Sequence, residues 1–309
     1  MIQGEGNSIA TPQFSIVIPV YDDWILLRQC LQSLADQTNE PSFEVVIVDD
    51  GSREPAPEFV FDSTRSHPLR VIRQSHSGIP AARNRGIGDA RGSLLLFVDA
   101  DCRLESTCLH ALSATIADSP EHDFFQLRLV GDRSTLAGRA EELRLVTFQN
   151  HTLQPDGRIR YLNTAGFAIR LTRAHLEGGV FDPLALRAED TLLLANLMQR
   201  GKLPLFVPGA IVEHSIPRSL LECIRKDIRS VYLEGRAYDI IESKGVRIRV
   251  THRERLQLLW ATWKNAGRLS IGRSAWFALV VRQTVQRSIS FAYRWLGVGS
   301  AVRVEGSNP

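Results

Sequence analysis

The chain has 309 residues, of which 44% are hydrophobic and 23% charged, and this balance excludes an intrinsically disordered protein. Its four cysteines show no CxxC pair, which excludes a disulfide scaffold and predicts buried thiols in a reducing compartment. Residues 1–13 lack the basic start and apolar run of a secretory signal, so we expect a loose leader there. Every apolar run is shorter than the ~20 residues that a spanning helix needs.

The net charge of +3 combines two oppositely charged parts. Residues 244–309 hold 12 basic and 2 acidic residues, whereas residues 1–243 hold 25 basic and 32 acidic residues. A basic tail behind an acidic body suits an anionic surface. No recognised nucleic-acid-binding module frames the tail, so we expect no nucleic-acid partner.

The first hundred residues alternate short apolar runs with helical patterns, which predicts an α/β fold with a mainly parallel sheet. Strands are expected over residues 14–20, 43–48, 69–74 and 93–98. Helices are expected after the first strand and over residues 79–91, and the proline-rich residues 53–68 predict loops with one poor helix.

The second half of the chain is predicted to be mixed and then helical. Helices are expected near residues 106–119, 138–150 and 188–200, and extended segments near 124–129, 162–169 and 203–212. From residue 217 onward the pattern is helical almost to the end.

Two of the predicted strands end in acidic residues, Asp49 with Asp50 and Asp99 with Asp101. Ligands of open parallel sheets bind beyond the carboxyl ends of the strands, so we expect these side chains to converge. A DxD triplet by itself is most often a solvated turn, but paired carboxylates also suit Mg²⁺ or Mn²⁺. Phosphatases of the haloacid dehalogenase kind need Thr or Val at the fifth motif position, where Arg103 stands here.

Six short motifs follow one another between residues 14 and 214. They are Ile18-Pro19-Val20-Tyr21, Val48-Asp49-Asp50-Gly51-Ser52, Gly78 with Ala82-Arg83-Asn84-Arg85-Gly86, Phe97-Val98-Asp99-Ala100-Asp101, Gly179-Val180-Phe181-Asp182 and Glu189-Asp190. In this order they resemble the family 2 glycosyltransferases, which are inverting enzymes with the GT-A fold. The resemblance implies a Rossmann-like catalytic domain over residues 14–216, with a nucleotide-binding half at about 14–102 and an acceptor half at about 103–216. A basic helical extension over residues 217–309 would follow it.

For the nucleotide, the resemblance implies that Pro19 and Tyr21 line the base pocket and that Asp49 or Asp50 hydrogen-bonds the base or ribose. Turn formation explains the two aspartates equally well. Arg83 matches an arginine that contacts the nucleotide in relatives, and its alternative is a surface cation on a helix. The neighbouring asparagine, at position 84, is expected to shape the turn or helix face instead of contacting the donor.

For the metal and the chemistry, the resemblance implies that Asp99 orients the ribose or a metal-bound water and that Asp101 binds Mn²⁺ or Mg²⁺. His214 matches a histidine that completes the metal shell in some relatives, although a packed histidine fits as well. Asp190 matches the catalytic base, with Glu189 supporting it. Acidic residues also favour helix N-termini for electrostatic reasons alone, which is the alternative for this pair.

One part of the family pattern is missing. Many relatives continue the acidic pair with a further acid and an arginine on the same helix, where this chain has Leu192 and Asn196. The handling of the acceptor, or a phosphate contact from that arginine, therefore differs here.

The function implied is transfer of a sugar from a nucleotide-diphosphate sugar, most commonly a UDP sugar, to an unidentified acceptor hydroxyl. Surface polysaccharide or glycolipid synthesis is the expected setting. A non-catalytic nucleotide-sugar-binding subunit is the first alternative. A sugar nucleotidyltransferase is the second, but it generally begins with a glycine-rich basic loop, where Tyr21-Asp22-Asp23-Trp24 stands here.

The C-terminal third suggests where the protein acts. Tryptophans at positions 260, 263 and 276 stand among arginines, a combination that suits a lipid headgroup boundary. Packing of these helices on the catalytic domain or on a second copy is an equally good interpretation. We therefore expect a cytoplasmic protein, peripheral on the cytoplasmic face of an anionic membrane or associated with itself.

Overall fold

The computed structural model describes residues 11–62, 67–183, 185, 188–215, 219–228, 231, 241, 245–246 and 250–295. The strands are β1 (Phe14–Val20), β2 (Phe43–Asp49), β3 (Leu69–Arg73), β4 (Leu94–Phe97), β5 (Cys102–Leu104), β6 (Phe124–Gly131), β7 (Phe167–Arg170) and β8 (Leu205–His214). The helices are α1 (Trp24–Ala35), α2 (Glu58–Asp62), α3 (Ile79–Asp89), α4 (Cys108–Asp118), α5 (Leu136–Thr152), α6 (Arg173–Gly178), α7 (Glu189–Gln199), α9 (His252–Arg268) and α10 (Arg273–Trp295). A short 3-10 turn over Thr164–Gly166 precedes β7.

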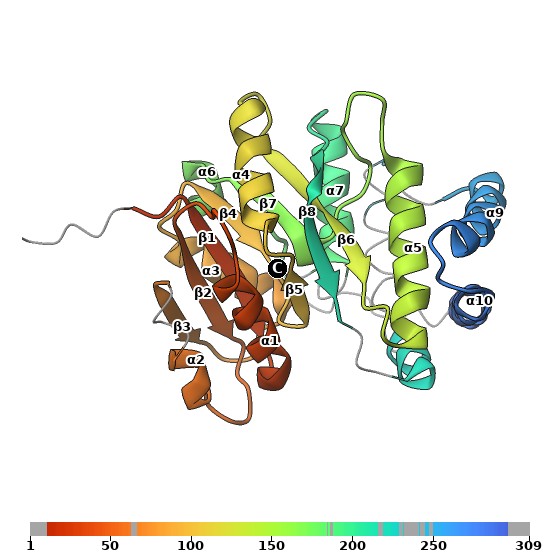
Figure 1. The fold of residues 1–309 in the computed structure, drawn as a ribbon, viewed down its shortest axis with the longest axis horizontal. Coiled ribbons are helices and arrows are strands. Elements are labelled where there is room, and N and C mark those ends of the chain that lie inside the picture. Colours follow the sequence, from red (N-terminus) through yellow and green to blue (C-terminus); the bar gives the residue numbers. More distant parts are fainter. Residues whose placement is uncertain are drawn as a thin grey trace, which may run out of the picture.

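The described strands form a single sheet in the order β3-β2-β1-β4-β7-β6-β8-β5 (Figure 1). The first four strands in this order are parallel, as predicted. The other half is mixed, because β7 runs antiparallel to both of its neighbours and β5 runs antiparallel to β8. The result is an α/β sheet whose two halves meet at the β4–β7 pair.

Burial explains why the central strands form. Every residue of β2 and of β4 is buried, which is the pattern of strands covered by helices on both faces. Helix α1 buries Trp24, Leu27, Cys30, Leu31 and Leu34, which lie on one stripe at helical spacing. The strand β5 has only three residues, which are too few to show an apolar run or an alternation of apolar and polar residues. The sequence analysis therefore missed it.

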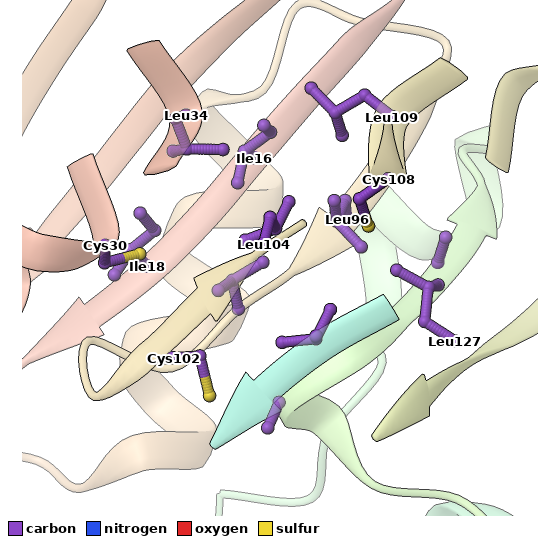
Figure 2. Close-up of a cluster of buried hydrophobic side chains, with 14 of the residues drawn as sticks. Ile16, Ile18, Cys30, Leu34, Leu96, Cys102, Leu104, Cys108, Leu109 and Leu127 are labelled. Carbon is purple, nitrogen blue, oxygen red and sulfur yellow. The ribbon is translucent and has the colours of Figure 1, made fainter. Parts of the chain in front are cut away.

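The main core lies between the sheet and the helices α1 and α4. Figure 2 shows Ile16 and Ile18 of β1 gathered with Leu34 of α1, Leu104 of β5 and Leu109 of α4. The four cysteines are all buried free thiols, as predicted.

The C-terminal helices α9 and α10 pack against α5, at the opposite end of the molecule from β3 (Figure 1). Their contact is a cluster of small and branched side chains: Ala140 and Leu143 of α5, Ala266 of α9, Ile271 between the helices, and Ala275, Ala278 and Leu279 of α10. Packing on the first domain, one of the two interpretations of this region, is therefore confirmed for the described residues. No helix among the described residues is long and apolar enough to cross a bilayer.

Some expectations lie outside the described residues. Residues 1–10 of the expected leader and residues 216–218, where the domain boundary was placed, are among them. Within the expected helical region, the described parts are helical over α9 and α10.

Candidate active site

Acidic residues follow the carboxyl ends of β2 and β4, which lie on either side of β1 in the parallel half of the sheet. Asp49 is the last residue of β2 and pairs in register with Val20. Asp99 and Asp101 follow the last residue of β4 by two and four positions. Because parallel strands end at the same edge of a sheet, the three carboxylates share the edge where ligands of such sheets bind.

The Asp50 carboxylate organises the loop that leads into α3. One oxygen accepts hydrogen bonds from the Ser77 amide at 2.9 Å and from Gln74 Nε2 at 2.8 Å, and the other accepts from the Gly78 amide at 2.8 Å. Asp50 is only 3% exposed, and its hydrogen bonds stabilise the loop. Turn formation, the alternative to nucleotide binding, is therefore one role of this carboxylate. Its contact with a base or ribose stays a prediction.

Asp49 holds its own turn. Its Oδ1 accepts from the Ser52 amide at 2.8 Å, and Oδ2 lies 3.3 Å from Nη1 of Arg73. Gly51 makes this turn with φ +79°, and a Cβ there would lie 2.8 Å from the backbone nitrogen of His76. Only glycine therefore fits between the two loops.

Tyr21 and His76 form an aromatic pair next to Asp50. The rings of Tyr21 and His76 lie 4.3 Å apart at an interplanar angle of 33°, and Tyr21 is 45% exposed. His76 Nδ1 lies 2.9 Å from Asp50 Oδ2, which holds the imidazole in place. Pro19, expected beside Tyr21 in the base pocket, is half-buried in β1. The sequence analysis missed His76, since a single histidine in a polar loop carries no pattern.

Arg83 of α3 connects two motifs that lie far apart in the sequence. Its Nη2 donates to Asp99 Oδ1 at 2.7 Å and its Nη1 to Glu189 Oε1 at 2.5 Å, while the side chain is 2% exposed. Burial alone would lower the pKa of Arg83, but the two carboxylates raise the pKa above its usual value. The surface-cation alternative for Arg83 is therefore wrong. Its contact with a nucleotide stays a prediction.

Replacing Arg83 with methionine is expected to lower the free energy of unfolding by about 3 kcal/mol, because two carboxylates lose a buried partner. Arg85→Met is the matched control. Arg85 pairs with Asp89 one turn along the same helix but is 55% exposed, so its loss should cost less than about 0.5 kcal/mol. Urea unfolding measures both variants, and equal midpoints would contradict the importance of the bridge.

Asn84, the next residue of α3, fixes the loop that leads toward the acidic pair. Its Oδ1 accepts from the amides of Val180 and Phe181, both at 3.0 Å, and its Nδ2 donates to the Phe181 carbonyl at 2.6 Å. Gly179 opens this loop with φ +67°, and a Cβ there would lie 3.0 Å from Asn84. The prediction that Asn84 shapes a turn is confirmed.

The acidic pair begins α7. The Asp190 carboxylate accepts a 2.6 Å hydrogen bond from the amide of Thr191, while Glu189 is held by Arg83. Burial, together with the negative charge of Glu189, raises the pKa of Asp190 to about 7. A carboxyl group with this pKa exchanges its proton near neutral pH, as a general base must.

The DxD segment has a histidine partner across the sheet. Strand β5 pairs antiparallel with β8 so that Cys102 lies opposite His214, which places His214 Nε2 3.3 Å from Asp101 Oδ2. The Asp101, Cys102 and His214 ligand atoms all lie within 4.8 Å of one another. Burial, and then the charge of Asp101, raises the pKa of the Cys102 thiol well above its usual value, so the thiol stays protonated. The remaining carboxylate suits Mn²⁺ and Mg²⁺ alike, whereas the imidazole suits the transition metal Mn²⁺ better than Mg²⁺, which prefers oxygen ligands.

Helix α5 contributes charged residues near this site that the sequence analysis did not find. Glu141 is 4% exposed and accepts from Arg144 Nε at 3.0 Å. Burial raises the pKa of Glu141, but Arg144 and then Arg282 lower it below its usual value. Burial lowers the pKa of His214, but Asp101 and then Glu141 raise it above its usual value. Burial raises the pKa of Tyr161, and the charges of Arg144 and Asp190 both act on it. In sequence the acidic and basic residues of α5 resemble a solvated helix face, so only packing reveals them.

A Rossmann-like parallel half, joined to a mixed half at a strand that ends in DxD, is the arrangement of the GT-A glycosyltransferases. TarS 1–349 of S. aureus, solved with UDP, aligns with a TM-score of 0.51 and 19% identity over 92% of this chain and 91% of that chain. A mannosyltransferase from Pyrobaculum calidifontis, solved with GDP-Man and Mn²⁺, aligns with a TM-score of 0.57 and 16% identity over 94% of this chain and 87% of that one. The fold is therefore GT-A, with a helical C-terminal segment.

Residues 15–175, more than half of the chain, match the family described as Glycosyl transferase family 2. The chain belongs to this family. Membership favours glycosyl transfer over the nucleotidyltransferase alternative. A PGL/p-HBAD biosynthesis glycosyltransferase of Mycobacterium bovis is 36% identical over 118 residues, which are 37% of this chain and 46% of the relative. Glycosyltransferase GlyA of Streptococcus pneumoniae is 33% identical over 107 residues, 34% of this chain and 15% of the relative. The matched segment thus covers less than half of either relative.

Proposed function

We propose that the chain transfers a hexosyl group from a nucleoside diphosphate sugar, with UDP as the carrier, to an acceptor hydroxyl with inversion at the anomeric carbon. The observation that carries this proposal is the Arg83 bridge. One buried guanidinium joins Asp99 of the DxD segment to Glu189, the neighbour of Asp190. The groups proposed for the donor and for the base therefore lie on either side of one cation.

The donor end of the proposed site is built from both halves of the sheet. Asp101 and His214 are the proposed ligands of Mn²⁺ or Mg²⁺, which, when bound, would offset negative charge on the leaving diphosphate. The exposed Tyr21 ring, which packs against His76, offers an aromatic face on which a base could stack, and Asp50 holds His76 in place. Structures of fold neighbours with UDP, and with GDP-Man and Mn²⁺, support this type of donor.

The proposed base is Asp190. Its carboxylate takes the proton of the acceptor hydroxyl while that oxygen forms a bond to the anomeric carbon. The bond from the anomeric carbon to the diphosphate oxygen breaks on the opposite face, and its electron pair leaves with the nucleotide. Glu189 supports the base because its charge, held in place by Arg83, helps to keep the pKa of Asp190 at about 7.

The pH profile tests this base directly. The carboxylate acts when deprotonated, so kcat/KM should fall about tenfold per pH unit below the Asp190 pKa of about 7 and level off above it. In Glu189→Gln the neighbouring negative charge is absent, so the inflection should move to lower pH. A flat profile between about pH 5 and pH 8 would contradict the assignment of the base.

The function as a whole is tested by the release of nucleoside diphosphate. We expect release from UDP sugars in a panel of UDP and GDP sugars, dependent on Mn²⁺ or Mg²⁺ and abolished by EDTA. A non-catalytic sugar-nucleotide-binding subunit would instead show a donor-dependent rise in melting temperature with no release. That outcome would overturn the proposed function.

For the acceptor, we propose a lipid-linked glycan or a growing surface polysaccharide, made in the cytoplasm. The name of the Mycobacterium bovis relative, which refers to PGL biosynthesis, supports a glycolipid setting. The buried free thiols suit a reducing compartment.

A further inference from the structure

Helices α9 and α10, which pack against α5 through their buried side chains, also expose large apolar side chains. Leu256 and Trp260 of α9 are 69% and 60% exposed, and Phe277 of α10 is 64% exposed. Leu256, Trp260 and Lys264 follow at intervals of four residues, so they share one face of α9. This face is unlike an ordinary solvated helix, whose outer positions are polar.

A small pocket opens beside Trp260, between α9 and the start of α10, and Phe277 lies one turn further along α10 from its lining residue Arg273. Its volume is about 360 Å³, and it is lined by Trp260, Trp263, Lys264, Ala266, Gly267, Gly272 and Arg273. The Lys264 ammonium lies 5.2 Å from the Trp260 ring and the Arg273 guanidinium 4.9 Å from the Trp263 ring. No acidic residue lines the pocket, so its two cations suit an anion of the size of a phosphate group.

The described part of the two C-terminal helices carries mainly positive charge, although one of its arginines, Arg282, is paired with Glu141 and Asp227. Among the described residues 250–295 there are eight arginines and lysines and one acid, Glu254. The Glu254 carboxylate accepts from the amide and hydroxyl of Thr251 in a capping box at the start of α9, away from the pocket. A second copy of this surface would bring like charges together, which opposes self-association through it.

We propose that the α9–α10 surface, formed by Leu256, Trp260, Lys264, Arg273 and Phe277, docks on a membrane that contains anionic phospholipids. The pocket takes a headgroup phosphate between Lys264 and Arg273. The exposed apolar side chains reach the boundary between headgroups and acyl chains, where tryptophan is favoured. A free phosphate would leave these apolar side chains in water, so it does not explain them.

The docked helices are firmly tied to the catalytic domain. Arg282 of α10 lies 3.3 Å from Glu141 of α5 and pairs with Asp227 through Nη2 at 3.0 Å. A membrane on the α9–α10 surface would therefore hold the active site at a defined orientation to the bilayer, as a lipid-linked acceptor requires. The docking itself does not depend on the proposed sugar transfer.

Co-sedimentation of the full chain with vesicles tests the docking. We expect pelleting with vesicles of phosphatidylcholine mixed with phosphatidylglycerol, little with phosphatidylcholine alone, and release by salt, which screens the charges. Reversing both pocket cations, Lys264→Glu with Arg273→Glu, should weaken partitioning at least about tenfold. The apolar double variant Trp260→Ala with Phe277→Ala should do the same.

The matched control is Ile25→Ala with Phe61→Ala, which removes exposed apolar side chains of α1 and α2 at the other end of the molecule. This variant should pellet like the wild type.

Lipids brominated in the acyl chains should quench the wild-type tryptophan fluorescence, and Trp260→Phe should lose most of that quenching. Equal pelleting of all variants, or a dimer in solution that Trp260→Ala dissociates, would overturn the proposal. Release of nucleotide from soluble donor, measured in the same variants, should stay unchanged and so reports on the sugar transfer separately.

Discussion

Replacing Asp190 by asparagine is expected to lower kcat about a hundred- to ten-thousandfold, because the amide cannot take the proton of the acceptor hydroxyl. The side chain keeps its size, and Arg83 keeps both of its carboxylate partners. Donor affinity, measured by thermal shift with a UDP sugar and Mn²⁺, should therefore change by no more than about threefold. Near-native transfer in this variant would remove Asp190 from the mechanism.

The same substitution should make the folded chain more stable at alkaline pH. The pKa of Asp190 is about 7 in the folded state against 3.8 for an ordinary aspartate, so the folded state binds the extra proton between these values. The stability contributed by this proton is present below about pH 4 and is lost as the pH rises toward 7. At about pH 8, Asp190→Asn should raise the free energy of unfolding by about 1 to 3 kcal/mol, and near pH 4 the difference should shrink. Glu189→Gln, which removes a partner of buried Arg83, should be destabilising and serves as the contrast.

The second large effect is expected at the proposed metal site. Asp101→Asn should reduce transfer at least about a thousandfold, since a metal ion supplies several kcal/mol of charge stabilisation to the leaving group. The apparent affinity for Mn²⁺, measured by titration of activity, should weaken about 10- to 100-fold. Asp123→Asn, an isosteric change at a partly exposed aspartate paired with Lys202, is the matched control and should leave both quantities unchanged. If Asp101→Asn kept the wild-type dependence on Mn²⁺, another group would have to hold the ion.

The strands of the parallel half could be predicted to within a residue or two, because they are short, mainly apolar segments between turn residues. The strands of the mixed half were harder to predict. The sequence of a strand of four residues, such as β7, does not indicate whether it runs parallel or antiparallel to its neighbours. Strand β5 has three residues directly after Asp101, and only its pairing with β8 reveals it. The sequence analysis also missed the helix α6, because six residues are too few to show a helical repeat of apolar residues.

The candidate site divides in the same way. Local motifs were enough to select Asp99, Asp101 and Asp190, because their residue types and their neighbours in the chain carry the signal. The Arg83 bridge could not be found from sequence, since its partners lie 16 and 106 residues away along the chain. The role of Asp50 in its loop could not be found from sequence either, because turn formation and nucleotide binding use the same carboxylate.

By itself, the sequence determined that this chain is an α/β protein of glycosyl transferase family 2, with acidic residues at strand ends and a basic, tryptophan-containing tail. These properties are local, since hydrophobic periodicity and short motifs depend on neighbours in the chain. Only the tertiary structure decided that Arg83 is a buried bridge, that β5 brings His214 to Asp101, and that α9 and α10 pack on α5 with one face exposed. These properties depend on which distant segments pack together and on the burial of charge, and packing is set by the whole chain.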